Sequence, residues 1–206
     1  MKKLLLLLSL SISFLSADDW SRWLGPHGTG VSNETDWQAN LEKVAWKAKV
    51  GLGFSAVSVA DGRLFTMGHD GIKQGGKETV WCLDAVTGKE LWSDSYEAQL
   101  VDYLHEGGPC ATPTVDGETV YAISKDGRLN AYLAAKGTLL WSKNMMTAAS
   151  MKKPPEWGFA GSPYVLDDLL IIEADYTFAL KKDSGKEVWR SKKYRHAYGS
   201  PVAFAH

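Results

Sequence analysis

The sequence predicts an all-β protein, a β-propeller built from four-stranded antiparallel blades. Three observations lead to this prediction. Four tryptophans, Trp46, Trp92, Trp141 and Trp189, recur at intervals of 46, 49 and 48 residues. Short β-rich runs fill each interval, and none of them has the periodicity of a helix. Four-stranded units of about 40 to 50 residues, with turn residues between the strands, are typical of propeller blades.

The last three of these tryptophans each close a small-x5-Gly-x3-Trp motif. The three copies are Cys82, Gly88 and Trp92; Ala131, Gly137 and Trp141; and Ala179, Gly185 and Trp189. The motif predicts two strands joined by a tight turn, because a glycine at this position takes the left-handed conformation that a short hairpin with a bulge requires. The small residue leaves room for a neighbouring indole.

The β-rich runs upstream of each motif complete the blades. We expect these strands at residues 63–67, 119–124 and 169–173, followed by residues 78–83, 129–133 and 177–180. The pairs Thr112-Pro113 and Ser162-Pro163 precede further strands at equivalent places in two of the repeats. Fibrous, helical-bundle and α/β folds are excluded by this pattern.

The repeat array is incomplete at both ends. Residues 44–50 have the pattern of a lone outer strand around Trp46, since Glu42 and Asp36 occupy the glycine and small positions of the motif. Residues 198–204 begin a fourth inner strand. About three blades are therefore expected, whereas a closed ring needs about four to eight. We expect the chain to be the N-terminal part of a longer product, with an incomplete ring.

The first 17 residues have the pattern of a secretory signal peptide. Two lysines precede a 12-residue apolar run, and Ser16 and Ala17 follow it. The run is too short to span a membrane, and no other segment is long or apolar enough to do so. The expected organisation is a signal peptide (residues 1–17), an N-terminal lead-in segment (18–43) and a partial propeller (44–206), exported to the periplasm or cell envelope.

Charge and cysteine content narrow the classes of partner. The formal net charge of −1 gives no broad basic surface for nucleic acid. The local basic cluster of Lys192, Lys193 and Arg195 is interpreted as a solvated turn. Whether Cys82 and Cys110 form a disulfide in an oxidising compartment is left open.

No catalytic or metal-ligating residue is assigned. Residues 51–56 match a dinucleotide fingerprint, but a strand pattern follows them where a helix is required. The five histidines have no spacing that puts two of them on one helical turn, and the two cysteines are not in a CxxC pair. A zinc site is therefore not expected.

The motif closely resembles the tryptophan-docking motif of quinoprotein-type propellers. This PQQ-like repeat family includes quinoprotein alcohol dehydrogenases and the outer-membrane assembly factor BamB. The resemblance covers residues 44–206, and the opening Trp20-Ser21-Arg22-Trp23 is similar to the start of secreted PQQ-like repeat proteins. It implies that each motif tryptophan is held between adjacent blades, stacked on the small residue and the glycine. The nine motif residues given above are on this basis structural docking residues.

The resemblance implies two functions from different classes. The first is an exported, non-enzymatic scaffold without a cofactor, which binds a protein partner such as the envelope assembly machinery. The missing cysteine for a lipid anchor counts against direct equivalence to BamB. The alternative is a quinoprotein dehydrogenase dependent on pyrroloquinoline quinone (PQQ), or a pseudo-enzyme derived from one. Such enzymes hold the quinone between a tryptophan and a vicinal disulfide, beside Ca²⁺, and this sequence has no adjacent cysteines.

Two long loops are the candidate binding elements. Residues 93–108 and 142–161 each join an outer strand to the inner strand of the next blade, and such loops gather on one face of a propeller, where binding sites form. Trp157 and Phe159 lie in the second loop, off the repeat period. Two interpretations stay open: these aromatic side chains are exposed for a partner, or they plug the space between blades.

Overall fold

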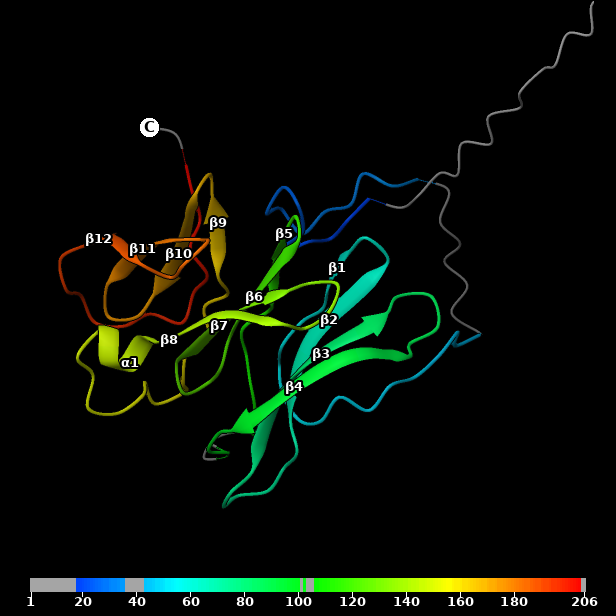
Figure 1. Cartoon of the computed structure of the whole chain (residues 1–206), viewed down its shortest axis with the longest axis horizontal. Helices are drawn as coiled ribbons and strands as arrows, with labels where there is room; N and C mark the ends of the chain where they lie inside the picture. The colour runs from blue at the N-terminus through cyan, green and yellow to red at the C-terminus, as the bar shows by residue number, and fades with distance from the viewer. Residues whose placement is uncertain (1–17, 36–42, 101, 103–105, 205–206) are drawn as a thin grey trace, which may run out of the picture.

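The computed structural model of the chain describes residues 18–35, 43–100, 102 and 106–204. Their strands form three antiparallel sheets, each made of four strands that are consecutive in sequence (Figure 1). The first blade contains β1 (Ser58–Ala60), β2 (Arg63–His69), β3 (Lys77–Asp84) and β4 (Glu90–Glu97). The second contains β5 (Thr114–Asp116), β6 (Thr119–Ile123), β7 (Arg128–Leu133) and β8 (Leu139–Asn144). The third contains β9 (Tyr164–Leu166), β10 (Leu169–Glu173), β11 (Thr177–Lys181) and β12 (Glu187–Arg190).

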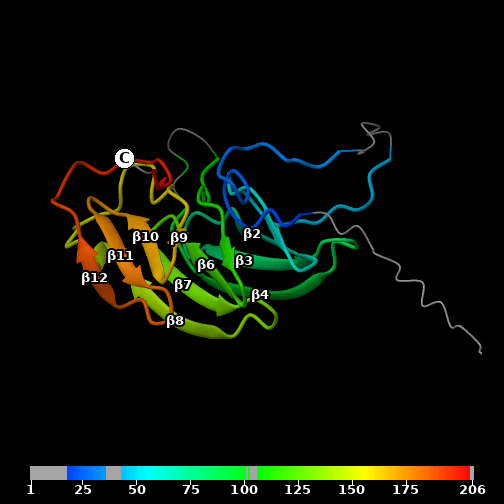
Figure 2. The same cartoon turned by 90° about the horizontal axis from the view of Figure 1, so that it is seen from above.

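The predicted fold is confirmed: the described chain is an all-β partial propeller whose three blades do not close a ring. One short helix, α1 (Met145–Ala148), interrupts it between the second and third blades. The blades follow one another in chain order (Figure 2), with β5 lying against both β1 and β9. These three short strands are therefore the inner edge of the assembly.

Two apolar cores fill the spaces between neighbouring blades. The core between the first and second blades contains Phe65, Val80 and Tyr132, and the core between the second and third contains Leu129 and Phe178. Burial is greater in the two middle strands of each blade than in the outer strand, so that β6 is almost wholly buried whereas β8 is mostly exposed. Burial of apolar surface between sheets is thus the main force that holds each blade to the next.

The motif hairpins have the geometry that the sequence predicts. The glycines that close them, Gly88, Gly137 and Gly185, have φ angles of 69°, 68° and 66°. Each hairpin contains a bulge directly after the small residue, and this small residue lies opposite the motif tryptophan in the pairs Cys82 and Trp92, Ala131 and Trp141, and Ala179 and Trp189. The left-handed glycine and the bulge are therefore confirmed in all three blades.

Each motif glycine is covered by an indole from the preceding repeat. A Cβ atom built on Gly88, Gly137 or Gly185 would lie 2.3, 2.6 or 2.8 Å from the rings of Trp46, Trp92 and Trp141, respectively. The indole Nε1 atoms of the same three tryptophans donate to the carbonyls of Ala85, Ala134 and Lys182 at 3.2, 2.8 and 3.1 Å. Trp189, in the last blade, is 46% exposed.

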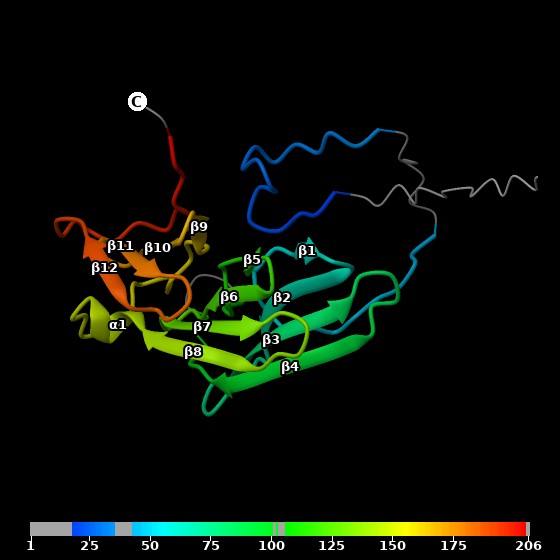
Figure 3. The same cartoon turned by 45° about the horizontal axis from the view of Figure 1, so that its top comes forward.

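Residues 20–22, near the start of the lead-in segment, contact the inner strand of each blade, and Figure 3 shows this blue part of the chain beside β1 and β5. Trp20 exchanges two backbone hydrogen bonds with Val59 beside β1, at 2.8 and 2.9 Å. The carbonyl of the next residue accepts from the backbone N–H of Val115 in β5 at 2.8 Å. The guanidinium of Arg22 lies 4.7 Å from the ring centre of Tyr164 in β9. One short segment thus contacts every blade.

Two predicted strands are absent. Residues 44–50 and residues 198–204 are described, but neither segment is hydrogen-bonded into a sheet. A strand needs a neighbouring edge with which to pair, and the contacts of these segments run through side chains instead. The indole of Trp81 donates to the carbonyl of Val50 at 3.0 Å, and the backbone N–H of Ser162 donates to the hydroxyl of Ser200 at 2.9 Å.

The remaining sequence expectations concern a disulfide between two cysteines and a signal peptide at the N-terminus. Cys82 and Cys110 are both free thiols, so the disulfide between them is not formed. The predicted signal peptide, residues 1–17, lies outside the described residues, as do residues 36–42 of the lead-in segment. Among the described residues, no helix is long and apolar enough to cross a membrane.

Candidate functional site

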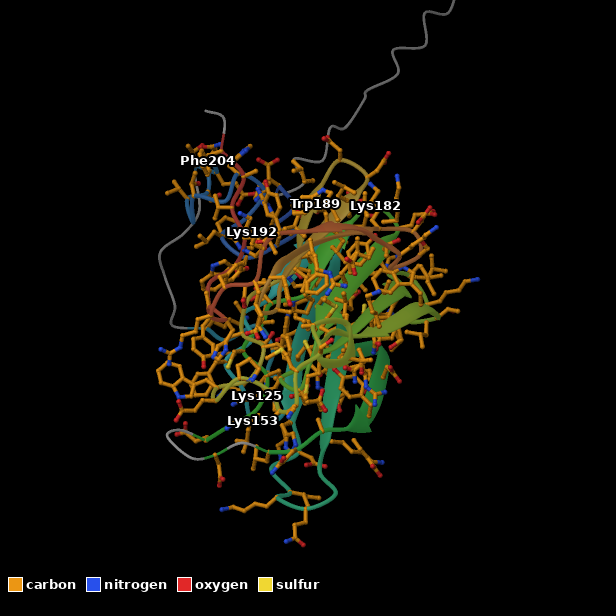
Figure 4. The ribbon with its side chains drawn as sticks, turned by 90° about the vertical axis from the view of Figure 1, so that its left-hand side faces the viewer. Lys125, Lys153, Lys182, Trp189, Lys192 and Phe204 are labelled. Carbon is orange, nitrogen blue, oxygen red and sulfur yellow. The ribbon has the colours of Figure 1, made fainter. Side chains whose placement is uncertain are left out.

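The loops that join the blades gather at one end of the sheets, which we call the loop face. It is the end that carries the β2–β3, β6–β7 and β10–β11 turns, opposite the motif hairpins. Backbone hydrogen bonds join Ala98 to Gly76 and Phe159 to Lys125, and so attach both interblade loops to these turns. Figure 4 shows the two ends, with Lys125 and Lys153 on the loop face and Lys182 at the opposite end.

A groove of about 1090 Å³ opens on the loop face beside the third blade. One wall is formed by residues 150–157, which follow α1. The other wall is formed by Lys193, Arg195, His196 and Tyr198, which follow β12, and by Asp175 in the β10–β11 turn. The groove is therefore built mainly from two segments that are far apart in sequence, one before the third blade and one after it.

Local sequence determines the first wall. Asn144 caps α1 by accepting a hydrogen bond from the backbone N–H of Thr147 at 2.9 Å, and the chain then turns at Ser150, whose φ is 54°. Gly158 packs so closely on Lys125 that a Cβ atom would lie 2.1 Å from that side chain. The segment is therefore fixed at both ends, with Trp157 immediately before the second attachment.

The structure separates the two aromatic residues of the candidate binding loop. Phe159 is 3% exposed and packs on Gly127, where an added Cβ atom would lie 2.6 Å from the phenyl ring. Trp157, two residues earlier, is 44% exposed and lines the groove. Of the two interpretations, Phe159 thus fits the plug between the blades, and its backbone N–H donates to the carbonyl of Lys125 at 2.9 Å.

An aromatic pair lines the groove. The ring centres of Trp157 and Tyr198 are 5.1 Å apart, with 31° between the ring planes. His196 meets Tyr198 edge-on at 5.3 Å, and its Nε2 lies 3.1 Å from the tyrosine hydroxyl. Aromatic side chains stacked in this way offer apolar area that loses little conformational entropy on binding.

The second wall is fixed to the third blade by two acids. The carboxylate of Asp175 lies 3.3 Å from both the Lys193 ammonium and the Nδ1 atom of His196. The carboxylate of Glu173 accepts from the backbone N–H groups of Asp175 and Ala197 at 3.2 and 3.1 Å. Burial raises the pKa of Glu173 above its ordinary value, although these hydrogen bonds act against the shift.

The rim of the groove carries cations without partners. The side chains of Lys152, Lys153 and Arg195 are exposed, and none of them forms an ion pair, hydrogen bond or ring contact within the described part of the chain. The sequence prediction of a solvated basic turn did not include Lys152 and Lys153. Of its members, Lys193 and Arg195 line the groove, whereas Lys192 does not.

A second cluster of titratable groups is buried between the first and second blades. Glu78 is fully buried, and its carboxylate accepts from the backbone N–H of Lys125 at 3.2 and 3.3 Å. Burial raises the pKa of Glu78 to about 7, and it lowers the pKa of Lys125. Burial also raises the pKa of the nearby Cys110 thiol. The cluster joins the two blades under the loop face, and sequence reasoning missed it.

The described residues do not fit the quinone site that the resemblance implies. The two cysteines are not adjacent and both are free. Within the described ranges, no group of three or more histidine, cysteine or acidic side chains is arranged to hold a metal ion. We therefore derive no chemical step from a quinone or from calcium.

Sequence comparison decides the family. The profile described as outer membrane protein assembly factor BamB matches residues 31–191. The chain belongs to this family. No curated protein sequence gives a significant match.

Solved structures share the fold of this BamB-family chain. The quinohemoprotein alcohol dehydrogenase of Comamonas testosteroni superposes with a TM-score of 0.59 at 22% identity, over 84% of this chain and 27% of that one. A europium-containing methanol dehydrogenase gives 0.53 at 16% identity, over 72% and 27%. BamB of Moraxella catarrhalis gives 0.48 at 19% identity, over 76% and 44%. The chain thus spans about a quarter of the length of each dehydrogenase.

Proposed function

We propose that this BamB-family protein is an exported scaffold that binds a protein partner in the cell envelope. The observation that supports this function best is the groove on the loop face, in which Trp157 is 44% exposed and stacked on Tyr198. Tryptophan and tyrosine dominate the energetics of protein interfaces when they lie in a pocket at the centre of the contact. These observations support the assignment of the proposed function to this groove.

Two further observations support the proposal. Residues 1–17 have the pattern of an export signal, which agrees with a role in the envelope. Trp46, Trp92 and Trp141, in contrast to Trp157, each cover the glycine of the next motif hairpin. Among the described residues, Trp157 covers no hairpin glycine, and its exposed area is available to a partner.

The proposal is tested by replacing Trp157 with alanine. We expect the melting temperature to stay close to that of the original chain, while envelope proteins crosslinked to the purified chain are lost. Trp23→Ala is the matched control, since Trp23 is 45% exposed and lies outside the groove. A crosslinking pattern that Trp157→Ala leaves unchanged would contradict a binding role for the groove.

The dehydrogenase alternative has a direct test of its own. PQQ and Ca²⁺ are added to the purified chain, and reduction of a dye is followed with alcohols and sugars as substrates. A scaffold gives no substrate-dependent reduction above the level of the free quinone. Turnover that requires the folded chain would overturn the non-enzymatic part of the proposal.

A further inference from the structure

We propose that the groove binds an acidic, extended segment of the partner protein. Carboxylates of the segment pair with Lys152, Lys153 and Arg195, and an apolar side chain of the segment rests on Trp157. This inference rests on the proposed function, because it names the chemistry of the partner for the same site.

The charge of the rim is the first argument. Some surface cations are paired within the chain: the ammonium of Lys193, in the wall of the groove, lies 3.3 Å from a carboxylate of Asp175, and that of Lys182, away from the groove, lies 2.8 Å from a carboxylate of Asp116. Lys152, Lys153 and Arg195 form no ion pair among the described residues. They lie on two segments that are far apart in sequence and that the fold brings to the same groove. Carboxylates of a bound segment would form ion pairs with these three cations.

The acids of the groove do not cancel this charge. The carboxylate of Asp175 already lies 3.3 Å from both Lys193 and His196. Glu156 is the one further acid that lines the groove. The groove is consequently positive, whereas the whole chain has a formal net charge of −1. Such local contrast steers an acidic partner to this place.

The shape of the site is the second argument. The cations line a groove of about 1090 Å³ together with the rings of Trp157 and Tyr198. A membrane surface or a nucleic acid is attracted by a broad basic face, which the composition does not provide. An extended chain with alternating acidic and apolar side chains fits the arrangement, because its apolar side chain reaches the rings while its carboxylates stay at the rim.

Three labelled peptides of equal length serve as probes for the full chain. Each carries a central phenylalanine, flanked by glutamates, by glutamines or by lysines, and binding is followed by fluorescence anisotropy at low and at high salt. We expect the glutamate peptide to bind most tightly and to lose affinity as salt screens its charges.

Charge reversal then locates the interaction. The double variant Lys152→Glu and Lys153→Glu should weaken binding of the glutamate peptide by about tenfold, at the upper end expected for exposed pairs. Lys186→Glu is the control, since Lys186 is exposed in the β11–β12 turn at the opposite end of the blade. It should change the dissociation constant by less than about twofold.

The outcomes separate this inference from the proposed function. If the glutamine or lysine peptide binds more tightly than the glutamate peptide, and Trp157→Ala abolishes that binding, the acidic partner is wrong while the protein-binding groove stands. If phosphatidylglycerol vesicles bind through Lys152 and Lys153 and the glutamate peptide does not, the inference is overturned in favour of a lipid surface. If no peptide binds the original chain, and Trp157→Ala leaves the envelope crosslinking unchanged, both the inference and the proposed function are wrong.

Discussion

The indole of Trp92 in the first blade covers Gly137 in the second, and its Nε1 donates to the carbonyl of Ala134 at 2.8 Å. Gly137 also has a φ of 68°. Gly137→Ala should therefore destabilise the fold by about 3 kcal/mol, because strain of the backbone adds to overlap with the ring. Urea denaturation measures the loss.

Gly117→Ala is the matched control for this substitution. Gly117 also has a positive φ, of 54°, but nothing lies within 4 Å of the position of its Cβ atom. Its replacement should lower stability by about 1 kcal/mol, from backbone strain alone. Equal losses in the two variants would show that the indole contact contributes nothing to the junction between blades.

The position of each motif tryptophan in the array gives a second prediction. Trp92→Ala should cost about 3 kcal/mol, since it removes packing on Gly137 and on the Tyr132 ring, whose centre is 5.6 Å away. Trp189→Ala should cost about 1 kcal/mol or less, because Trp189 is 46% exposed. Thermal unfolding of both variants tests the order, and a larger loss for Trp189→Ala would contradict it.

The buried carboxyl of Glu78 makes stability depend on pH. Its pKa in the folded chain is about 7, above its ordinary value of 4.5, so between these pH values the folded state holds a proton that the unfolded state has released. Stability should therefore fall as the pH rises from about 4.5 to about 7, by at most about 3 kcal/mol.

Glu78→Gln removes this titration and keeps an oxygen that accepts from the backbone N–H of Lys125. Denaturation at a series of pH values should show a smaller fall for this variant than for the original chain. Glu118→Gln, at an exposed position, should leave the original slope in place. Identical slopes for Glu78→Gln and the original chain would place the source of the pH dependence elsewhere.

The two aromatic residues of the loop after α1 should respond in opposite ways. Phe159→Ala should destabilise the chain by about 4 kcal/mol, because Phe159 is 3% exposed in the core between blades. Trp157→Ala should cost less than about 1 kcal/mol, since much of its ring is free. Differential scanning calorimetry of both variants measures the loss of stability. A larger loss for Trp157→Ala than for Phe159→Ala would show that Trp157 fills the space between blades.

The spacing of the tryptophans predicted the blades. Each hairpin places a glycine under the indole of the preceding repeat, so the tryptophan and the glycine recur at regular intervals in the sequence. The groove could not be predicted in the same way. Lys153 and Arg195 are separated in sequence by a whole blade, and only the packing of that blade brings them to one rim. A local signal existed in the two adjacent lysines before Pro154, close to Trp157.

Two other differences also have physical causes. Phe159 and Trp157 are both aromatic, and only the packing of the folded chain, in which Phe159 lies on Gly127, distinguishes the buried residue from the exposed one. Residues 44–50 have the composition of a strand, but strand formation depends on the surrounding packing, and this segment joins none of the three described sheets. Contacts between residues that are far apart in sequence cannot be predicted from the local spacing of residue types.

The path of the lead-in segment bears on how the blades unfold. In an ordinary repeat protein each unit contacts only its neighbours, so the array can melt from one end in steps. Here Trp20 is hydrogen-bonded beside β1 while Arg22 lies on Tyr164 in β9. The first and third blades are thereby coupled without the second as intermediary, which favours a single cooperative transition over stepwise fraying.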